Sequence, residues 1–448
     1  MSLMISVSGI RGIFGPDLNP ENISQFSAAF GTWTNSGTIV LGRDTRQSGE
    51  IIEQSVVTAL RAKGCRVIRV GIVPTPTVAM GVLRYKADGG IAITASHNPE
   101  QWNGLKFLNS KSEFLDQEQI KEVIKLSESK SISYKTYQEI GEMVIDDGLT
   151  EHHIDEILKL PYIKPDEISK KSFKVAVDAV NGAGSLVLPN LLYKLGVSEV
   201  VEHNCTPDGN FPHDPEPIPE NLDSIREVVK QENCDLGIVV DPDSDRLAFV
   251  DDQGTLFGEE YTVAALTDFY LSINKGPTAV NLSSSRVNED IAFQYGVNCH
   301  RAAVSEISVV KEMQRRNAVI GGEGNGGVIN PDLHYGRDAL VGAAMFLQHL
   351  TNLDISSSEY RKKLPHYEMT KTKIPLNGQM PDKVIASLEE VFQHEKTSNI
   401  DGLKIDFEDG WVHLRKSNTE PIMRVFSEAK TNERARQLAT NVINLINT

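Results

Sequence analysis

Cysteine is scarce in this sequence. Its 448 residues contain four cysteines, Cys65, Cys205, Cys234 and Cys299, and no two of them form a C-x-x-C pair. Thiols scattered in this way give no framework for a cysteine-ligated metal, and they are typical of a protein that stays reduced. We therefore expect a cytoplasmic location.

Long apolar runs are also lacking. No run reaches the length of about 18 apolar residues that a membrane span needs, and the N-terminus has none of the regions of a signal peptide. Basic residues are outnumbered, since 45 Lys and Arg face 61 Asp and Glu for a net charge of −16. Non-specific attraction to nucleic acid or to an anionic membrane is therefore not expected.

Two widespread catalytic motifs are missing as well. The chain has no G-x-S-x-G elbow, which argues against an α/β-hydrolase. It has no G-x-x-x-x-G-K-[ST] loop, which argues against a P-loop ATPase. An acidic protein that binds phosphate must then gather its few arginines and backbone N–H groups locally, so clusters of these groups are informative.

One pattern recurs along the chain: an apolar run typical of a strand ends in a glycine-rich or polar loop. Amphipathic stretches at helical spacing, such as 116–127, 152–160 and 220–230, lie between these runs. Strands that alternate with helices predict α/β layers, with ligands at the carboxyl ends of the strands. The four instances are 89–94 with its loop 95–99, 173–177 with 178–184, 236–240 with 241–245, and 318–320 with 321–327.

Polar gaps in the pattern suggest where domains meet. At ~150 residues a domain, the length predicts about three domains, with two or four equally compatible. We expect four units, and the last one differs in pattern from the others. Their boundaries are 1–150, 151–255, 256–365 and 366–448.

Three carboxylates stand at every second position in the loop 241–246, D-P-D-S-D-R. Asp241, Asp243 and Asp245 can turn toward one hard cation, and this donor set suits magnesium. An EF-hand is excluded because Arg246 stands where that loop needs glycine. An alternative is a dehalogenase-type phosphatase, in which Asp241 itself would be phosphorylated.

A serine loop, T-A-S-H-N-P at 94–99, follows one of the apolar runs. Ser96 is a candidate nucleophile for phosphoryl transfer, in which positioning and charge stabilisation do most of the work. His97 follows it directly, but side chains adjacent in sequence rarely touch, so no Ser–His triad is inferred. A hairpin turn at Asn103-Gly104 is expected to bring Lys106 back beside the loop, as a phosphate contact or a general acid/base. Taken alone, the serine loop is equally compatible with an ordinary turn.

Other polar clusters could bind a sugar phosphate. R-K-S-N-T-E-P at 415–421, with Arg424 after it, places two guanidinium groups around a polar turn, a good arrangement for a phosphate dianion. A surface turn is the alternative. Clusters at 8–12, with Arg11, and at 42–46 are more typical of structural turns. In G-E-G-N-G-G at 322–327, Glu323 and Asn325 could hydrogen-bond sugar hydroxyls.

Together, these loops resemble those of the α-D-phosphohexomutase family, which includes phosphoglucomutase, phosphomannomutase and phosphoglucosamine mutase. T-A-S-H-N-P resembles the phosphoserine loop, D-P-D-S-D-R the magnesium loop, G-E-G-N-G-G the sugar loop and R-K-S-N-T-E-P the phosphate loop. The resemblance implies three related α/β domains with mixed sheets and a C-terminal α+β domain around a central cleft. The four units above would then be, in order, the phosphoserine-loop, metal-binding-loop, sugar-binding-loop and phosphate-binding domains.

The resemblance also implies roles for the site residues. A phosphoryl group on Ser96 would share a magnesium ion with the three aspartates, surrounded by Arg11, His97, Lys106 and Arg246. Hexose or hexosamine 1- and 6-phosphates would interconvert through a 1,6-bisphosphate. The sugar hydroxyls would be bound by Glu323 and Asn325, and the non-reacting phosphate by Arg415, Ser417, Asn418, Thr419 and Arg424.

Two positions depart from the pattern of some members. Gly327 stands where some carry His, so any proton transfer by that His is absent or moved here. Asn325 stands where many have Ser, which leaves open the choice among glucosamine, mannose and glucose phosphates. A sugar-phosphate-binding protein without catalysis is the remaining alternative, although Ser96, Lys106 and the aspartates argue against it.

Overall fold

The computed structural model describes residues 3–129, 132–376, 380–416 and 422–446. The chain forms two compact units. One comprises residues up to 262 together with 326–361, and the other comprises 263–325 together with the residues from 362 onward.

The first unit begins with a mixed sheet of seven strands in the order β1-β2-β6-β5-β3-β4-β7. Strands β3, β4, β5 and β7 run parallel, while β6 is antiparallel to β5 and β2. The strands are β1 (Met4–Ser6), β2 (Gly9–Ile13), β3 (Thr38–Arg43), β4 (Arg66–Ile72), β5 (Gly89–Ile93), β6 (Trp102–Asn109) and β7 (Met143–Ile145).

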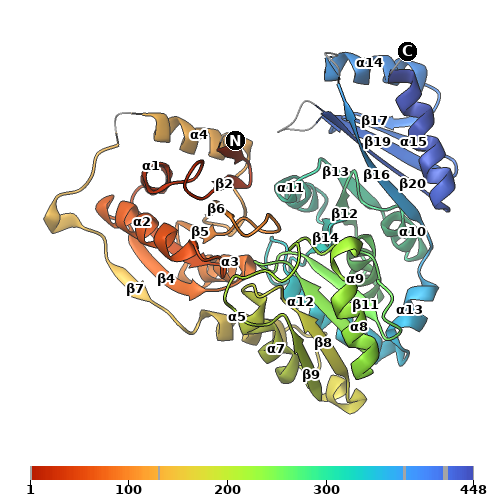
Figure 1. Cartoon of the computed structure of the whole chain (residues 1–448), viewed down its shortest axis with the longest axis horizontal. Coiled ribbons are helices and arrows are strands. Elements are labelled where there is room, and N and C mark those ends of the chain that lie inside the picture. Colours follow the sequence, from red (N-terminus) through yellow and green to blue (C-terminus); the bar gives the residue numbers. More distant parts are fainter. Residues whose placement is uncertain (1–2, 130–131, 377–379, 417–421, 447–448) are drawn as a thin grey trace. The chain divides into compact units, whose positions relative to one another are not determined.

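Helices cover both faces of this sheet (Figure 1). Alternate residues of β3 face opposite cores: Ile39 and Leu41 pack with α1, α2 and α4, and Val40 packs with α3. This alternation follows from the period of two in a strand. Asp116 caps α4: its side chain accepts from the N–H of Gln119, and its own N–H donates to Oε1 of Gln119. The helices are α1 (Pro20–Trp33), α2 (Gly49–Ala62), α3 (Thr75–Tyr85) and α4 (Gln117–Glu128).

The expected hairpin turn at Asn103-Gly104 is wrong. Both residues lie inside β6, and the connection from β5 is the serine loop itself. Gly104 is needed for close approach, because a Cβ there would lie 2.4 Å from the carbonyl oxygen of Ile10. The pairing of β6 with β2 and β5 therefore overrides the local turn preference. Lys106 nevertheless lies near the serine loop, because it stands on β6, the strand that follows this loop.

A second sheet in this unit has the order β11-β10-β8-β9. Its strands β8, β9 and β10 run parallel, with β10 buried throughout and β9 partly exposed at the edge, and β11 returns antiparallel to β10 after the loop 241–246. Helix α5 begins three residues before the predicted 152, and α8 three after the predicted 220. The elements are α5 (Leu149–Leu158), α6 (Pro165–Ile168), β8 (Lys174–Asp178), α7 (Gly184–Lys194), β9 (Glu199–His203), α8 (Asp223–Glu232), β10 (Leu236–Val240) and β11 (Leu247–Asp251).

Three later elements complete the first unit or lead out of it. Helix α12 is buried along nearly its whole length, and Phe346 on it stacks on Phe249 of β11 with ring centroids 4.0 Å apart. The elements are β15 (Gly327–Ile329), α12 (Ala339–Leu353) and α13 (Ser357–Lys363).

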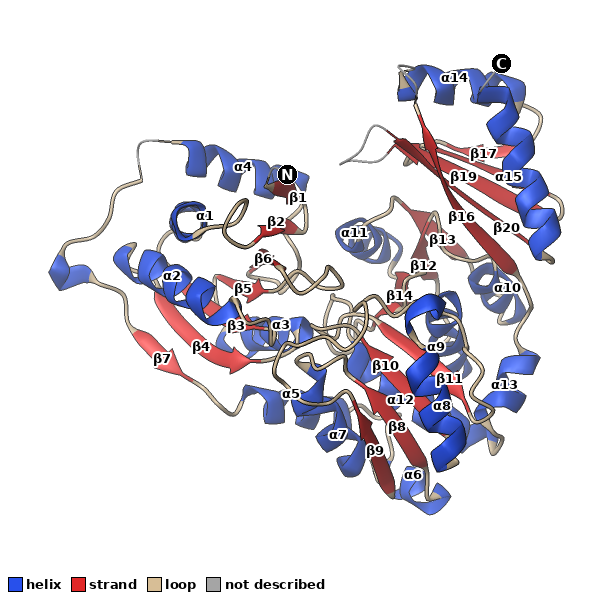
Figure 2. Cartoon of the chain, viewed as in Figure 1, coloured by secondary structure: helices blue, strands red, loops and turns tan. Residues whose placement is uncertain are grey.

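The second unit contains a parallel set of strands in which β12 pairs with β13 and β14. It also contains a five-stranded antiparallel sheet in the order β16-β20-β19-β18-β17. Helices α14 and α15 lie along one side of that sheet (Figure 2). The elements are α9 (Glu259–Ile273), which enters from the first unit, β12 (Thr278–Asn281), α10 (Val287–Gln294), β13 (Cys299–Ala302), α11 (Glu306–Arg316), β14 (Ile320–Glu323), β16 (Glu368–Pro375), α14 (Pro381–Val391), β17 (Lys396–Ser398), β18 (Leu403–Phe407), β19 (Gly410–Lys416), β20 (Ile422–Ala429) and α15 (Asn432–Ile446).

The predicted fold class is confirmed. Mixed sheets between helices make up most of the chain, and an antiparallel sheet with helices on one side ends it. Among the described residues, no helix combines the length and apolarity needed to cross a bilayer.

Candidate active site

Ser96 lies in the loop between β5 and β6, and its backbone has a φ of +49°. A non-glycine residue in the left-handed region is strained, and such strain persists only where surrounding contacts enforce it. One contact is local, since the N–H of Ser96 donates to Oγ1 of Thr94 at 2.9 Å. The residue is 4% exposed, so its hydroxyl is held in a defined, nearly dry position.

Arg46 fixes the rest of this loop. Its Nη2 donates to the carbonyl oxygens of Ser96 and Asn98, both at 2.6 Å. Its Nη1 donates to the carbonyl oxygens of Pro99 and Trp102 at 2.6 and 2.9 Å. Its Nε donates to Oδ2 of Asp44 at 3.1 Å, so the whole guanidinium fork is used.

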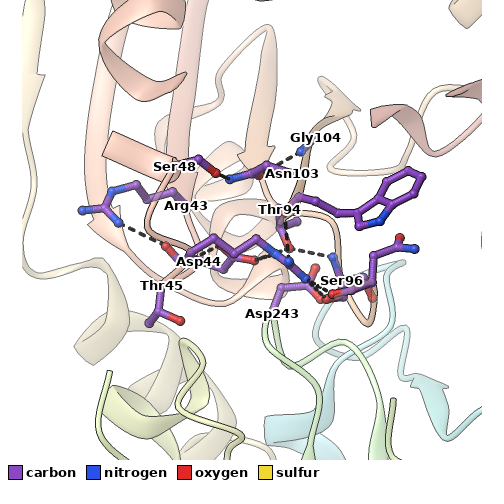
Figure 3. A network of polar contacts seen from close by, with 12 residues as sticks. Arg43, Asp44, Thr45, Ser48, Thr94, Ser96, Asn103, Gly104 and Asp243 are labelled. Atoms are coloured by element: carbon purple, nitrogen blue, oxygen red, sulfur yellow. Dashed lines mark hydrogen bonds and ion pairs between the residues drawn. The ribbon is translucent and has the colours of Figure 1, made fainter. Parts of the chain in front are cut away.

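Asp44 joins the two strands that carry these loops (Figure 3). Its Oδ2 accepts from Oγ1 of Thr94 at 2.6 Å as well as from Arg46. Burial raises the pKa of Asp44, against the lowering effect of Arg46. The cluster at 42–46 is therefore structural, as expected, but the structure it maintains is that of the serine loop.

The aspartate loop meets the serine loop directly. Oγ of Ser96 donates to Oδ2 of Asp241 at 2.6 Å. The other oxygen of Asp241 accepts the N–H groups of Asp245 and Arg246, both at 3.1 Å. The loop joins the antiparallel strands β10 and β11, so its carboxylates project at the carboxyl end of β10.

Lys106 reaches the same carboxylates from β6. Its Nζ donates to Oδ2 of Asp243 at 2.6 Å and to Oδ2 of Asp245 at 2.8 Å. Thr75, at the start of α3, donates from Oγ1 to the same oxygen of Asp243 at 2.5 Å. Burial alone would lower the pKa of Lys106, but Asp243 and Asp245 raise it above its ordinary value. Lys106 is therefore a fixed positive charge.

The three aspartates fit a divalent cation. One ligand oxygen from each lies within 4.8 Å of the others. Oδ1 of Asp243 and Oδ1 of Asp245 are buried and have no hydrogen-bond partner among the described residues. Buried polar atoms rarely stay unpartnered, and hard oxygen donors are what magnesium binds.

Mutual repulsion of the carboxylates is visible in their pKa values. Burial, followed by the charges of Asp243 and Asp245, raises the pKa of Asp241 well above its ordinary range. Burial also acts to raise the pKa of Asp245, but Arg337 and Lys106 outweigh it and hold that pKa low. A cation among the three would relieve the repulsion on Asp241.

The expectation that His97 would not touch Ser96 is wrong. The left-handed turn at Ser96 brings Nδ1 of His97 to 3.3 Å from Oγ of Ser96. Nε2 of His97 faces Nη2 of Arg246 at 3.4 Å, and a guanidinium can only donate. Accepting from Arg246 at Nε2 would place the proton of a neutral ring on Nδ1, facing Ser96; Nε2 also lies 3.9 Å from Oε1 of Glu216. Burial and the charges of Arg246 and Arg11 lower the pKa of His97 well below its ordinary value, so the ring is neutral.

The two predicted arginines beside this centre have protein partners here. Nη1 of Arg11 donates to Oδ1 of Asn98 at 3.1 Å. Nη1 of Arg246 donates to Oε1 of Glu216 at 2.9 Å. The first unit thus brings together Ser96, His97, Lys106, Arg11, Arg246 and the three aspartates.

The remaining predicted residues lie in the second unit or outside the described residues. Glu323 is buried and accepts from Nδ2 of Asn281 at 3.0 Å, while Asn325 is half-buried. Ser417, Asn418 and Thr419 lie outside the described residues. That these residues lie near Ser96 therefore stays a prediction.

Arg415 and Arg424 are direct partners across β19 and β20, so their side chains share one face of the sheet. Lys373 on β16 is the partner of Arg424 on the other side. Three cations therefore stand in a row across three strands. Nη1 of Arg415 donates to Oδ2 of Asp401 at 3.3 Å, and a phosphate would bring further negative charge to the row, in which like charges otherwise repel one another.

Sequence reasoning missed several residues of the first unit. Arg46, Thr75, Glu216 and Arg337 each touch a loop that carries a predicted site residue. Only the paired arginines of 42–46 carried a signal in the sequence. The others stand among ordinary neighbours, and their partners are far away along the chain.

The comparisons with known proteins agree with this geometry. Four models of the phosphoglucomutase/phosphomannomutase family match the chain in order: alpha/beta/alpha domain I at 3–132, domain II at 151–254, domain III at 258–367, and the C-terminal domain at 376–445. The chain belongs to the phosphoglucomutase/phosphomannomutase family. Members of this family are named as mutases, a class of isomerases.

Relatives extend over the whole length of the chain. A phosphoglucomutase/phosphomannomutase of Thermococcus kodakarensis is 38% identical, over 98% of this chain and 97% of its own. A probable phosphoglucosamine mutase of Methanopyrus kandleri is 33% identical, over 100% and 98%. The crystal structure of a phosphoglucomutase/phosphomannomutase family protein from Burkholderia thailandensis superposes with a TM-score of 0.86 at 26% identity, covering 99% of this chain and 97% of that one.

Proposed function

We propose that this family member is a phosphohexomutase that interconverts hexose or hexosamine 1- and 6-phosphates through phospho-Ser96 and a 1,6-bisphosphate intermediate. The observation that carries the proposal is the 2.6 Å bond from Oγ of Ser96 to Asp241, beside the fixed charge of Lys106. Phosphoryl transfer needs positioning and charge more than covalent activation. The substrate is a phosphoglucosamine or a phosphoglucose/phosphomannose, since the names of the relatives cover both choices.

Asp241, Asp243 and Asp245 would hold a magnesium ion, with the unpartnered Oδ1 atoms of the latter two as ligands. Bound there, magnesium would supply positive charge beside the phosphoryl group on Ser96, which carries about −1.5 to −2 charges at neutral pH. Lys106, Arg11 and Arg246 add fixed positive charge from the protein. Lys106, which donates to Asp243 and Asp245, would serve as a phosphate contact or as a general acid/base.

In this structure, the hydroxyl of Ser96 is protonated and donates a hydrogen bond to Asp241. That hydrogen leaves when the oxygen of Ser96 takes a phosphoryl group, and the sugar oxygen that gives up the phosphoryl group takes up a hydrogen in the same step, so no net proton is consumed. His97 is neutral, and with its proton on Nδ1 it would orient the serine oxygen. Near-complete burial keeps water from the ester that would form.

The non-reacting phosphate would be bound in the second unit by Arg415, Arg424, Ser417, Asn418 and Thr419, to which the row of cations adds Lys373. Glu323 and Asn325 would bind the sugar hydroxyls. On this proposal the boundaries 1–150, 151–255, 256–365 and 366–448 delimit domains that each bring one loop to the substrate.

Intact-mass analysis of freshly purified protein tests the proposal. A fraction about 80 Da heavier, the mass of one added phosphoryl group, should be present and should map to Ser96. Ser96→Ala should remove both this fraction and the interconversion of hexose 1- and 6-phosphates, with an unchanged Tm. Ser110→Ala, at an exposed site just after β6, is the matched control and should keep both.

Other results would favour other functions. Phosphate on Asp241 together with hydrolysis of sugar phosphates would support a dehalogenase-type phosphatase. Binding of sugar phosphates without interconversion would support a non-catalytic protein. A comparison of kcat/KM on glucosamine, mannose and glucose phosphates would identify the substrate.

A further inference from the structure

Arg337, in the turn before α12, reaches into the aspartate loop. Its Nη2 donates to Oδ2 of Asp245 at 2.8 Å, and its side chain is 9% exposed. The same oxygen accepts from Nζ of Lys106. Oδ2 of Asp245 is therefore occupied by two cationic donors, while Oδ1 has no partner among the described residues.

Gly327, at the start of β15, makes room for this side chain. A Cβ at position 327 would lie 2.1 Å from Cδ of Arg337, and also 2.9 Å from its Cγ and 3.1 Å from its Nε. No two such atoms can approach so closely without bonding, so any larger residue at 327 must displace Arg337. The φ of Gly327 lies outside the left-handed region, so space, and not backbone conformation, is what requires glycine here.

The backbone on both sides of Arg337 is held in place. Arg337 itself forms an isolated bridge to Ile329, and the N–H of Asp338 donates to the carbonyl oxygen of Val328 at 2.9 Å. The buried side chain of Asp338 caps α12 by accepting the N–H of Leu340 at 2.8 Å. The path of the Arg337 side chain over Gly327 is thus set by a fixed backbone.

Two buried histidines complete this anchor. Nε2 of His153 lies 2.9 Å from Oδ2 of Asp338, and Nε2 of His334 lies 3.2 Å from the same oxygen. Nδ1 of His153 in turn lies 3.0 Å from Oγ1 of Thr77 on α3. The cluster ties α3, α5 and α12 together immediately beside Arg337.

We propose that Arg337 is a positioning residue of the metal centre, which fixes Asp245 so that Oδ1 faces the cation, and that glycine at 327 is required for this. The inference rests on the proposed function, since it assigns the cation to the aspartate loop. With both of its donors in place, the carboxylate cannot rotate to exchange its oxygens. Residues that orient a metal ligand in this way commonly contribute about 10–100-fold to metal affinity or activity.

Binding of Mn²⁺ as a probe, measured by electron paramagnetic resonance, tests the proposal without relying on turnover. Arg337→Met keeps the aliphatic stem and removes the guanidinium, and its Mn²⁺ affinity should fall about 10-fold, the lower end of the range for such residues. Arg337→Lys should recover part of the loss, since Lys keeps the charge without the fork. Gly327→Ala should reproduce the loss by displacing Arg337.

The double variant Gly327→Ala/Arg337→Met gives the sharpest result. If the two positions act through one contact, it should bind Mn²⁺ no more weakly than Arg337→Met alone. Additive losses would overturn the claim for Gly327, and an unchanged or higher affinity in Arg337→Met would overturn the claim for Arg337. Gly148→Ala and the exposed Arg315→Met are matched controls and should bind as the wild type does.

Kinetics separate a positioning role from a merely structural one. In Arg337→Met, kcat at saturating substrate should fall, and more Mg²⁺ should be needed for half-maximal rate, while KM for the sugar phosphate stays nearly constant. If wild-type protein shows no mutase activity but the variants still weaken Mn²⁺ binding, the proposed function fails and the role of Arg337 stands. If wild-type protein is an active mutase but Arg337→Met binds Mn²⁺ normally, the proposed function stands and the role of Arg337 fails.

Discussion

The hydroxyl of Ser96 donates a 2.6 Å hydrogen bond to Asp241, a residue 145 positions away in the sequence. The bond joins the loop that would carry the phosphoryl group to the loop that would carry the metal. A phosphorylated Ser96 has no hydroxyl hydrogen to donate, so this bond exists only in the dephosphorylated protein. Phosphorylation therefore leaves the carboxylate of Asp241 in need of another positive partner, and a cation can fill that need.

The first prediction concerns removal of the metal and of its ligands. Treatment with EDTA should abolish the activity, and Mg²⁺ should restore it. Asp241→Asn should lower kcat by about 10²–10³-fold, as expected when one charge-stabilising group is lost. In EDTA the same variant should have a higher Tm than the wild type, because it removes a buried carboxylate that Asp243 and Asp245 repel. A lower Tm in EDTA would contradict the repulsion inferred here.

The second prediction concerns Arg46, which donates to four carbonyl oxygens of the serine loop and its neighbours. Arg46→Lys has only three donors, so buried carbonyl groups are left unpaired at about 1–3 kcal/mol each. We expect a lower free energy of unfolding, measured by urea titration, and a lower fraction of phosphorylated Ser96. Arg43→Lys, at a side chain that is 17% exposed, is the matched control and should change both much less.

The third prediction concerns the row of cations in the second unit. Arg424→Gln should raise KM for the sugar phosphate by about 10–100-fold, which corresponds to the ~1.5–3 kcal/mol of a hydrogen bond to a charged group. Lys373→Gln should raise KM less, because Lys373 is exposed. Lys371, on the same strand, pairs with Phe426 and not with an arginine. The KM of the Lys371→Gln variant should therefore match that of the wild type. Equal KM values in all three variants would place the phosphate elsewhere.

The fourth prediction concerns pH and the buried His413 of β19. Burial lowers the pKa of His413 to about 4, and its ring nitrogens contact Oγ of Ser283 and the carbonyl oxygen of Asp401. An unfolded chain binds this proton at a pKa of about 6.5, so the unfolded state takes up protons first as the pH falls. The contribution of His413 to the free energy of unfolding is therefore full above about pH 6.5 and declines as the pH falls toward about 4. The loss is about 2–3 kcal/mol at pH 4.5.

The measurement is the free energy of unfolding at pH 7.5 and pH 4.5. His413→Gln cannot titrate, so its loss of stability over this interval should be smaller than that of the wild type. His366, which is exposed, provides the control: His366→Gln should lose as much as the wild type does. An equal loss in His413→Gln would show that other groups dominate the acid sensitivity.

The order of the four loops made most of the candidate site predictable. Ser96 and the three aspartates each follow a buried strand, and the carboxyl ends of such strands are where α/β proteins bind ligands. The contact between Ser96 and Asp241 could be anticipated from the chemistry that both loops require, although the sequence of neither loop predicts the distance between the two residues. The predicted helix 116–127 matches α4 within one residue because its cap and its apolar spacing agree.

Tertiary contacts explain what the sequence could not show. Asn103-Gly104 has the chemistry of a tight turn, yet β6 runs through it because β2 and β5 pair on either side. His97 touches Ser96 only because the backbone of Ser96 adopts a left-handed conformation that Arg46 and Thr94 enforce. Arg337 meets Asp245 across 92 residues, and its need for Gly327 is a matter of the space that a single methyl group would fill.

The contacts of Arg46 have a consequence for anyone who would transplant the serine loop. The segment 94–99 does not carry its own conformation, since the carbonyl groups of Ser96 and Asn98 are held by an arginine about fifty positions earlier. A peptide of this segment, or the same letters grafted onto another scaffold, would relax out of the strained backbone at Ser96. The placement of the Ser96 hydroxyl, which would accept phosphate in the proposed function, therefore depends on the assembled sheet, and a nascent chain acquires it only after both halves of that sheet have come together.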